Sequence, residues 1–465
     1  MRRSYSRNDG SKFKFFALFA LLCFIVFGIF KIFTSPKFEQ NPPKIELENQ
    51  IYWNLTSPLK FKVSDDTGIK KVVVILKDAE RTSVLKDEEY SVSQTQTEIS
   101  VDFPKNLVLN KGANYTLEVS VSDISKWNFT LGNESKIKAN IIIDNKKPTI
   151  NIINQSYKIT KGGAAIVVFK ATDEMLDKVF VRTNYGKEFS AVPFEKDGFY
   201  AALIAWPANL DEFRADVVAT DKAGNVSNSQ IRYFYADKKY KISNIALTQK
   251  FIDGKVSELV EIYAQNPSKL EGIDKFKFVN EVLREENGKF IKKATSKIHE
   301  EKFDKFEIRP FSPLKNAAAV ASYGDHRIYS WQGEKLSESW HMGLDLASTA
   351  AAPIIESNYG VVVETTENGI YGLNIVVYYG FGLYGIYAHC TSSNVSIGDQ
   401  VKPGDILGNT GATGFAFGDH LHFGTIVQGV ETRPEEWMDP KWMKDNIFDI
   451  LENAKKTIKG RKIIY

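Results

Sequence analysis

An apolar run near the N-terminus is the first pattern along the chain. It extends from Phe15 to Phe30, and Ile32 and Phe33 continue it around Lys31. At about 1.5 Å rise per residue, a helix over this run approaches the roughly 30 Å hydrocarbon core of a bilayer. The residues before it are basic: Arg2, Arg3, Arg7, Lys12 and Lys14. Because basic flanks stay in the cytoplasm, residues 1–37 are predicted to be a cytoplasmic stub and a single-pass anchor, with the rest of the chain exported.

A cleaved signal peptide is the alternative for this run. Cleavage requires small residues just after the apolar stretch, whereas the chain continues Phe33-Thr34-Ser35-Pro36. The pattern therefore favours an uncleaved anchor, and both interpretations place the later domains outside the cytoplasm.

Short strand-like runs follow over residues 41–145. Lys60-Phe61-Lys62-Val63 alternates polar and apolar positions, which is typical of a half-buried strand. The run from Val72 to Leu76 is continuously apolar, as in a strand that is buried on both faces. These runs predict a β-sandwich.

Residues 146–237 repeat this plan. Three positions correspond: Pro43 and Pro148 near the start, Asp65 and Asp173 after a strand, and Asp123 and Asp221 at the same spacing from Tyr115 and Phe213. Two units of about 100 residues predict tandem β-sandwiches, which resemble the immunoglobulin-like modules of bacterial surface proteins. Such modules serve spacing or binding rather than chemistry.

The period changes in the C-terminal half. Residues 238–310 carry apolar positions at helical spacing and predict two helices, joined around Asn266-Pro267, that act as a linker or as a cover on the next domain. Residues 311–440 are rich in glycine and strand-like runs and predict a β domain. Residues 441–465 predict a charged helix whose lysines form a solvated face. The predicted fold is mainly β and multidomain.

Length, charge and cysteine content narrow the functional classes. A chain of 465 residues exceeds what one hydrophobic core organises. A net charge of +3 gives no field that points to nucleic acid as a partner. Of the two cysteines, Cys23 lies in the apolar run and cannot readily pair with Cys390, which excludes a disulfide scaffold.

Four of the six histidines lie between positions 341 and 422, within the glycine-rich segment: His341, His389, His420 and His422. Residues i and i+2 of a strand share a face, so His420 and His422 can point into one cleft. His341 and Asp345 are four apart, and Gly343 between them disfavours a helix. Zinc takes imidazole nitrogen and carboxylate oxygen at about 2.0–2.2 Å and keeps an open position in catalytic sites. Coincidental core histidines are the alternative, but the combination within one β segment favours a metal site.

These motifs resemble peptidase family M23, the lysostaphin-like zinc endopeptidases. The resemblance covers roughly residues 311–440 and rests on four segments: Tyr323 to Tyr329, His341 to Ala347, Gly404 to Gly411, and His420-Leu421-His422-Phe423-Gly424. It implies a small antiparallel β domain with one Zn²⁺ held by His341, Asp345 and His422, and with His389 and His420 as unligated catalytic histidines. Many members read Pro-His-Leu-His-Phe-Glu, so Asp419 and Gly424 depart from the pattern at groove positions rather than at ligands.

The resemblance implies a zinc metalloendopeptidase that hydrolyses peptide cross-links of bacterial peptidoglycan. By association, a membrane anchor without a wall-binding tail fits the inner membrane and periplasm, and hence a D-alanyl–diaminopimelate bond. Peptidoglycan, the cytoplasmic membrane and protein regulators of the cell-wall machinery are the expected partners. Carboxypeptidase trimming stays open. A non-catalytic regulator of other wall hydrolases is the alternative function, and an adhesion protein leaves the histidines unexplained.

Several other residues have competing interpretations. Cys390 follows His389, but neighbours on a strand face opposite ways, so a buried small residue is favoured over a Cys–His nucleophile. Arg327 is equally consistent with a fork that binds a substrate carboxylate and with a residue that pins a loop. His326 is expected to be exposed or near the groove, and His299 to be solvated on a helix.

Overall fold

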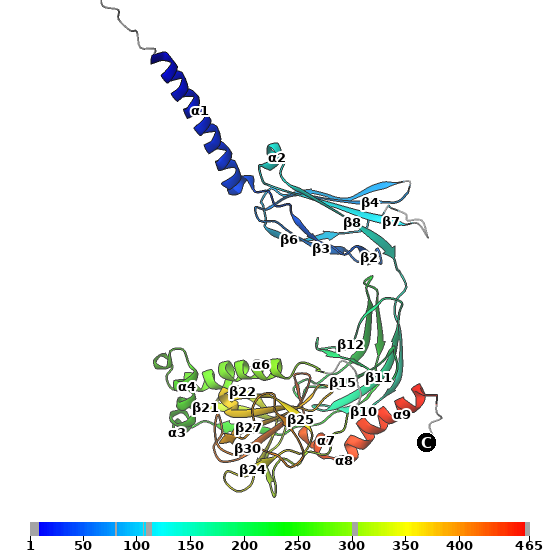
Figure 1. The fold of residues 1–465 in the computed structure, drawn as a ribbon. Coiled ribbons are helices and arrows are strands. Elements are labelled where there is room, and N and C mark those ends of the chain that lie inside the picture. Colours follow the sequence, from blue (N-terminus) through cyan, green and yellow to red (C-terminus); the bar gives the residue numbers. More distant parts are fainter. Residues whose placement is uncertain (1–8, 80, 106, 108–113, 300–305, 461–465) are drawn as a thin grey trace, which may run out of the picture. The chain divides into compact units, whose positions relative to one another are not determined.

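The computed structural model describes residues 9–79, 81–105, 107, 114–299 and 306–460. Arg2, Arg3 and Arg7 of the predicted basic flank lie outside the described residues. The apolar run forms α1 (Asp9–Thr34), coloured blue in Figure 1. Its segment Phe13–Thr34 is about 33 Å long at the usual helical rise, which is sufficient in length and composition to cross a membrane. A signal sequence passes the same criterion.

The described residues form two compact units, residues 1–147 with 221–225 and residues 148–220 with 226–465. The first unit contains a β-sandwich, as predicted. One sheet has the order β1 (Lys44–Glu46), β3 (Leu59–Ser64), β6 (Gln96–Val101). The other has the order β2 (Gln50–Trp53), β8 (Glu134–Ile143), β7 (Tyr115–Asp123), β4 (Ile69–Lys77), β5 (Thr82–Glu89). A short helical turn, α2 (Trp127–Thr130), follows β7.

Strict alternation along β7 shows why these residues form a sandwich. Tyr115, Leu117, Val119 and Val121 are buried, whereas the residues between them are only partly buried. Successive side chains of a strand point to opposite faces, so one face of β7 supplies the core.

The second sandwich begins the second unit. Its two sheets have the orders β14-β15-β11-β9 and β13-β12-β16-β17, and β10 pairs with β18. The strands are β9 (Thr149–Gln155), β10 (Lys158–Thr160), β11 (Ala164–Thr172), β12 (Leu176–Thr183), β13 (Glu188–Ser190), β14 (Val192–Pro193), β15 (Phe199–Ala205), β16 (Ala215–Asp221), β17 (Val226–Gln230) and β18 (Phe234–Ala236).

Two helical stretches joined by a loop follow, as predicted. The first comprises α3 (Gln249–Phe251), a π-helical turn (Ile252–Val256) and α4 (Ser257–Tyr263). The second comprises α5 (Ile273–Lys277), a π-helical turn (Phe278–Leu283) and α6 (Arg284–Ala294). His299 lies beyond the end of α6, so its assignment to a helix is wrong.

The region predicted to be helical, residues 238–310, also contains a strand that the sequence pattern did not indicate. Residues Ile242–Ala246 form strand β19, which pairs in parallel with β21 (Asp325–Trp331) from Ile242↔His326 to Ala246↔Ser330. A run of five residues is too short for its pattern to identify a strand. The strand that pairs with it, β21, lies more than 80 residues later in the chain.

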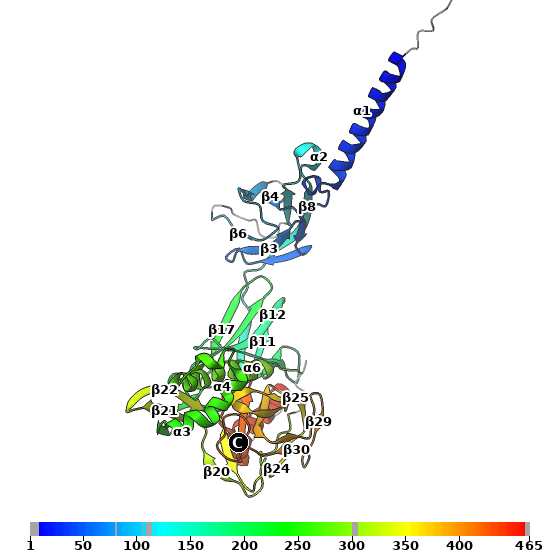
Figure 2. The ribbon, with the colours of Figure 1, turned by 90° about the vertical axis from the view of Figure 1, so that its left-hand side faces the viewer.

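The histidine-rich segment forms the predicted antiparallel β domain. Its main sheet has the order β20 (Ala318–Ala321), β23 (Leu344–Ala347), β31 (Leu421–Val427), β27 (Leu383–Cys390), β26 (Leu373–Tyr378), β25 (Gly360–Glu367), β29 (Gln400–Val401), with β32 (Val430–Thr432) beside β31. Two smaller sheets have the orders β19-β21-β22 (Glu334–His341) and β24 (Pro353–Ile355), β30 (Ile406–Asn409), β28 (Ser392–Ser393). Figure 2 shows α3, α4 and α6 beside β21 and β22. The mainly β, multidomain fold is confirmed.

The C-terminal helices pack against the second sandwich. They are α7 (Pro434–Met438), α8 (Pro440–Met443) and α9 (Asp449–Ile458), and residues 461–465 lie outside the described part. Ser156 Oγ donates to the Asn446 carbonyl at 2.8 Å. Lys455 and Lys459 both pair with Glu195, so the expectation that all the lysines are merely solvated is wrong. One continuous hydrophobic core contains side chains of the second sandwich, the β domain and α9.

Candidate metal centre and catalytic groove

Strand register brings the three predicted ligands together. His341 ends β22, Asp345 lies on β23 and His422 lies on β31. Asp345 and His422 are directly paired across the antiparallel strands β23 and β31. Residues opposed in this way have Cβ atoms about 4.5–5.5 Å apart and share one face of the sheet.

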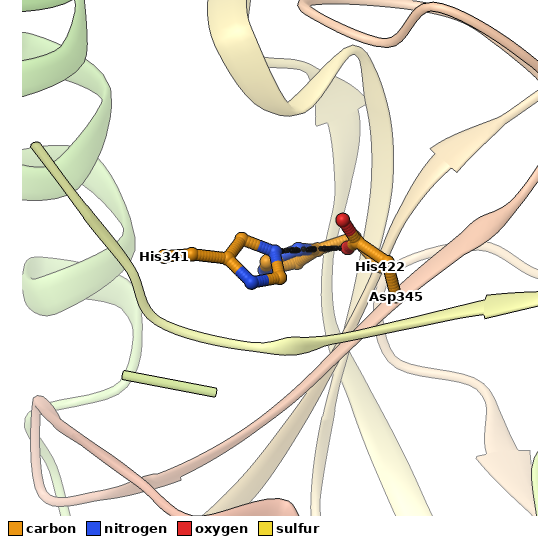
Figure 3. Close-up of side chains that lie close together, drawn as sticks. All are labelled: His341, Asp345 and His422. Carbon is orange, nitrogen blue, oxygen red and sulfur yellow. Dashed lines mark hydrogen bonds and ion pairs between the residues drawn. The ribbon is translucent and has the colours of Figure 1, made fainter. Parts of the chain in front are cut away.

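The three side chains converge on one point, as Figure 3 shows. Asp345 Oδ1 lies 2.9 Å from both His341 Nε2 and His422 Nδ1, and these two nitrogens are 3.1 Å apart. Ligand atoms around a tetrahedral Zn²⁺ with bonds of about 2.0–2.1 Å are separated by about 3.3 Å. The donor atoms therefore already stand close to the spacing that a metal ion requires.

A hydrogen bond to the backbone fixes the tautomer and the orientation of the His341 ring. Its Nδ1 lies 2.9 Å from the Ser322 carbonyl oxygen and must donate to it. In the neutral ring, Nε2 then turns a lone pair toward the oxygen of Asp345. The contact is repulsive unless a cation or proton lies between the two atoms, so the donor set fits a metal ion. Burial raises the pKa of Asp345, but the adjacent rings of His341 and His422 outweigh it and hold this pKa far below its usual range.

Gly343 is required by the site. A Cβ at this position would lie 2.4 Å from Cε1 and Nε2 of the His422 ring. The glycine within His341-Met342-Gly343-Leu344-Asp345 thus makes room for the third predicted ligand.

His389 and His420 lie beside the three ligands. Their ring centroids are 4.8 Å apart, and the His389 ring is 5.8 Å from that of His422. His389 Nδ1 lies 2.9 Å from the Thr413 carbonyl oxygen, and His420 Nδ1 lies 2.8 Å from that of Gly418. Because each Nδ1 donates to a carbonyl, each neutral ring keeps a lone pair on Nε2.

Two features set His389 apart. Its φ of 65° lies in the left-handed region, and the pairing of β26 with β27 shifts register beside it. Such a bulge redirects a side chain and is concentrated at functional sites. Burial, followed by the charges of His422 and His420, lowers the pKa of His389 to about 3, so the ring is neutral at physiological pH.

A groove of about 640 Å³ opens over these histidines. The helical region lines one wall, where Phe251 of α3 stacks on Phe417 with ring centroids 4.8 Å apart. Further lining residues are Tyr329, Tyr371 and Phe415. Another hollow, of about 700 Å³ over His299, Tyr359 and Tyr378, holds none of the predicted site residues.

Three cations line the groove: Lys241, Arg284 and Arg327. Arg327 Nε lies 3.3 Å from Asp325 Oδ2, so Arg327 is both held by a carboxylate and present in the groove. Arg284 Nε donates to Asn280 Oδ1 at 3.2 Å, and no carboxylate of the described residues forms an ion pair with Arg284. Lys241 and Arg284 precede the β domain, and no motif in the sequence marks them.

The remaining candidates lie away from the groove chemistry. His326 stacks on Trp340 at 4.5 Å and pairs with Glu338, and it does not line the groove. Cys390 is fully buried, and burial raises the pKa of its thiol to about 12, which leaves no thiolate for attack. Cys390 is the buried small residue that the sequence favoured.

Comparisons with known proteins agree with these motifs. The family model described as "Peptidase family M23" matches residues 339–434, and the family model described as "Bacterial Ig-like domain" matches residues 37–145 and 160–238. Peptidoglycan DD-endopeptidase ShyC of Vibrio cholerae is 27% identical over 123 residues, which are 26% of this chain and 28% of the relative. DD-carboxypeptidase/endopeptidase Mpg of Neisseria meningitidis is 27% identical over 108 residues, which are 23% of this chain and 25% of the relative.

These matches are local. The chain spans about a quarter of the length of the two curated relatives. Among solved structures, the catalytic domain of lysostaphin from Staphylococcus simulans is 27% identical, with a TM-score of 0.24 and coverage of 27% of this chain and 94% of that one.

Proposed function

We propose, from the premise that residues 339–434 belong to peptidase family M23, that this protein is a zinc metallopeptidase that hydrolyses peptide bonds in bacterial peptidoglycan. One observation carries the proposal. The donor atoms of His341, Asp345 and His422 lie within 3.1 Å of one another at a groove that also holds two unligated histidines.

The ligand chemistry favours zinc. Two imidazole nitrogens and one carboxylate oxygen form a three-residue set of the kind found in catalytic zinc sites, which keep a fourth position for water or substrate. Calcium and magnesium prefer sites made of oxygen alone. When bound, Zn²⁺ supplies a Lewis acid that polarises the scissile carbonyl and acidifies a water.

His389 and His420 provide the proton chemistry. Each turns an Nε2 lone pair toward the groove, so one can accept a proton from the attacking water while the other, once protonated, donates to the developing oxyanion or the leaving amine. The low pKa of His389 keeps its lone pair free at neutral pH. The assignment of the two roles between the two rings stays open.

The groove supports an anionic peptide as substrate. Lys241, Arg284 and Arg327 offer positive charge, and aromatic rings line the remaining wall. Peptidoglycan stem peptides carry free carboxylates, which an arginine binds in a fork. The names of the two curated relatives refer to peptidoglycan and to DD-peptidase activity. A D-alanyl–diaminopimelate cross-link and C-terminal trimming are both compatible with such a groove.

The rest of the chain supports a position at the cell envelope. Helix α1 has the length and composition of a membrane anchor, with its basic flank in the cytoplasm and the sandwiches and peptidase in the periplasm. The helical region on the groove wall is a natural contact for protein regulators. A non-catalytic regulator could dispense with the metal ligands. The chain keeps the three proposed ligands and both further histidines of the groove, which supports catalysis instead.

Digestion of purified sacculi tests the proposal. Full-length protein in detergent should release muropeptides, identified by mass, and a chelator should stop the release until Zn²⁺ is restored. A matched variant, His326→Ala, removes a histidine outside the groove and should digest normally. Release that persists without metal, or in a His422→Ala variant, would contradict the proposed mechanism.

A further inference from the structure

Three carboxylates that are far apart in the sequence lie close together at the first sandwich. Glu39 lies in the segment between α1 and β1, Asp65 in the turn between β3 and β4, and Asp123 at the end of β7. Each offers one oxygen to a group whose members all lie within 4.8 Å of one another. This cluster belongs entirely to the first unit and is separate from the groove chemistry.

Two oxygens of the cluster have no hydrogen-bond partner among the described residues. Asp65 is only 8% exposed, and its Oδ1 accepts hydrogen bonds from Thr67 N and Gly68 N at 2.9 and 2.7 Å. Its Oδ2 is buried and, within the described residues, accepts no hydrogen bond, and the same holds for Glu39 Oε2. A buried carboxylate oxygen without a partner is costly, and each such atom in a native protein requires an explanation.

No side-chain cation of the described residues forms an ion pair with these three carboxylates. In the part of the chain that the structure describes, the ion pairs of this sandwich involve other acids, such as Lys71 with Asp87 and Lys77 with Glu118. Asp66, next to Asp65, adds a further carboxylate on the exposed side. Several like charges at this spacing repel one another in the absence of a cation.

The cluster is held in place by its own hydrogen bonds. The Glu39 carbonyl oxygen accepts from Ser125 Oγ at 2.6 Å and from Asn133 Nδ2 at 2.9 Å. Asn133 Nδ2 also donates to Asp123 Oδ2 at 2.7 Å. Because the backbone of Glu39 is tied to the residues around Asp123, the carboxylates are positioned before any ion binds, as supporting residues do in metal sites.

We propose that Glu39, Asp65 and Asp123 bind one Ca²⁺ ion. A set made only of oxygens selects a hard cation, and Ca²⁺ accepts the flexible geometry of carboxylates from three separate segments better than Mg²⁺ does. Water and backbone carbonyls complete its six to eight ligands. At the sequence level, acidic residues recur at the same three positions of the second repeat: Asp144, Asp173 and Asp221.

The ion would fasten the segment that follows the anchor helix to the sandwich. Glu39 belongs to that segment, whereas Asp65 and Asp123 belong to the sandwich itself. Ca²⁺ thus crosslinks the base of the first module, and its loss frees the connection next to the membrane.

Calorimetry on the full-length protein tests the site. Zinc-loaded, Ca²⁺-free protein in detergent is titrated with CaCl₂, and an affinity of about 10⁻⁴–10⁻³ M, usual for extracellular modules, is expected. Glu39→Gln and Asp65→Asn should each weaken Ca²⁺ binding by about tenfold or more, because each removes one of three charged ligands. The control Asp66→Asn removes an exposed neighbouring charge and should retain the wild-type Ca²⁺ affinity.

A second measurement guards against misfolding. Trypsin should cut after Lys37 more slowly when Ca²⁺ is present, and Glu39→Gln should abolish this protection while circular dichroism stays that of the native protein. No Ca²⁺ binding up to about 10 mM, well above the expected range, would overturn the proposal. Wild-type Ca²⁺ affinity in both Glu39→Gln and Asp65→Asn, or tighter binding of Mg²⁺ than of Ca²⁺, would overturn it as well.

Discussion

Asp345 and His422 stand opposite each other on paired antiparallel strands, with Asp345 Oδ1 2.9 Å from His422 Nδ1. Two central elements of the sheet therefore set the spacing between a carboxylate and an imidazole, and no loop has to move to form the pair. A site built on strands in this way holds its ligands more precisely than one built on loops.

Replacing His422 with alanine should remove the metal without unfolding the protein. The substitution takes away one of three donor atoms, and zinc affinity should fall by more than about 100-fold. Zinc content per chain, measured by elemental mass spectrometry, checks this. His326→Ala serves as the control, and retention of stoichiometric zinc by His422→Ala would show that another residue completes the site.

His389→Gln should separate catalysis from metal binding. The ring donates to Thr413 and is not one of the three proposed ligands, so zinc content should stay at the wild-type level. The value of kcat should fall by about 10²–10⁴, the usual contribution of a general acid or base. Kinetics on a soluble cross-linked peptide measure the loss. Normal turnover would assign the proton transfers to His420 alone.

Gly343→Ala should mimic the loss of a ligand. The added methyl would lie 2.4 Å from the His422 ring, so that ring must shift and zinc affinity should fall by about 10–100-fold. Gly288→Ala, in open space on α6, is the matched control and should be neutral or stabilise the protein by up to about 1 kcal/mol. Unchanged zinc affinity in Gly343→Ala would mean that the ring has room to adjust.

Arg284→Ala should raise KM for an anionic peptide with little change in kcat. The guanidinium lines the groove, and losing a charged hydrogen bond to substrate costs about 1.5–3 kcal/mol, which is tenfold or more in KM. Lys289→Ala on the exposed face of the same helix, where Lys289 pairs with Glu285, is the control. An equal KM for the neutral amide of the peptide and for its acid would remove Arg284 from substrate recognition.

Glu356 should make stability depend on pH. Burial raises the pKa of this carboxyl to about 7, although Ser357 N, Asn358 N and the Tyr379 hydroxyl donate to it. The folded state therefore binds more protons than the unfolded state between pH 4.5 and pH 7. The contribution of Glu356 is fully present below pH 4.5 and is lost as pH rises through 7.

Glu356→Gln should cancel this dependence. Its amide oxygen can accept the two backbone hydrogen bonds, and its NH₂ can donate to Tyr379, which donates in turn to Tyr387. Relative to wild type, the variant should gain about 1–3 kcal/mol in free energy of unfolding between pH 5 and pH 8. Denaturant unfolding at both pH values measures the gain, and the comparison removes the pH dependence of zinc binding. A constant difference between the two proteins would contradict the raised pKa.

Local patterns in the sequence identify the candidate residues of the site. His420 and His422 of His-x-His share one face of a strand, and Gly343 disfavours a helix between His341 and Asp345. The choice of His341, Asp345 and His422 as the ligands comes from the resemblance to peptidase family M23 and stays a prediction. The bulge that redirects His389 is different, because it arises from a register shift against β26 that no local pattern reveals.

The sequence offers a cover on the next domain as one role for the helical region, but it does not indicate that this region lines the groove. The helical period of residues 249–294 identifies helices but not the surface on which they pack, and Phe251 and Arg284 acquire their positions only through β21, β22 and the loop at Phe417. Strand β19 was missed because its partner edge is distant in the chain.

Because β19 pairs with β21, the β domain that holds the candidate site cannot be separated from residues 242–246 without losing a strand. A fragment cut at residue 311 would lose a strand that lies outside the matched family region and would leave the edge of β21 bare for association with other chains. A fragment that begins before Lys241 would keep β19 and leave the β21 edge paired.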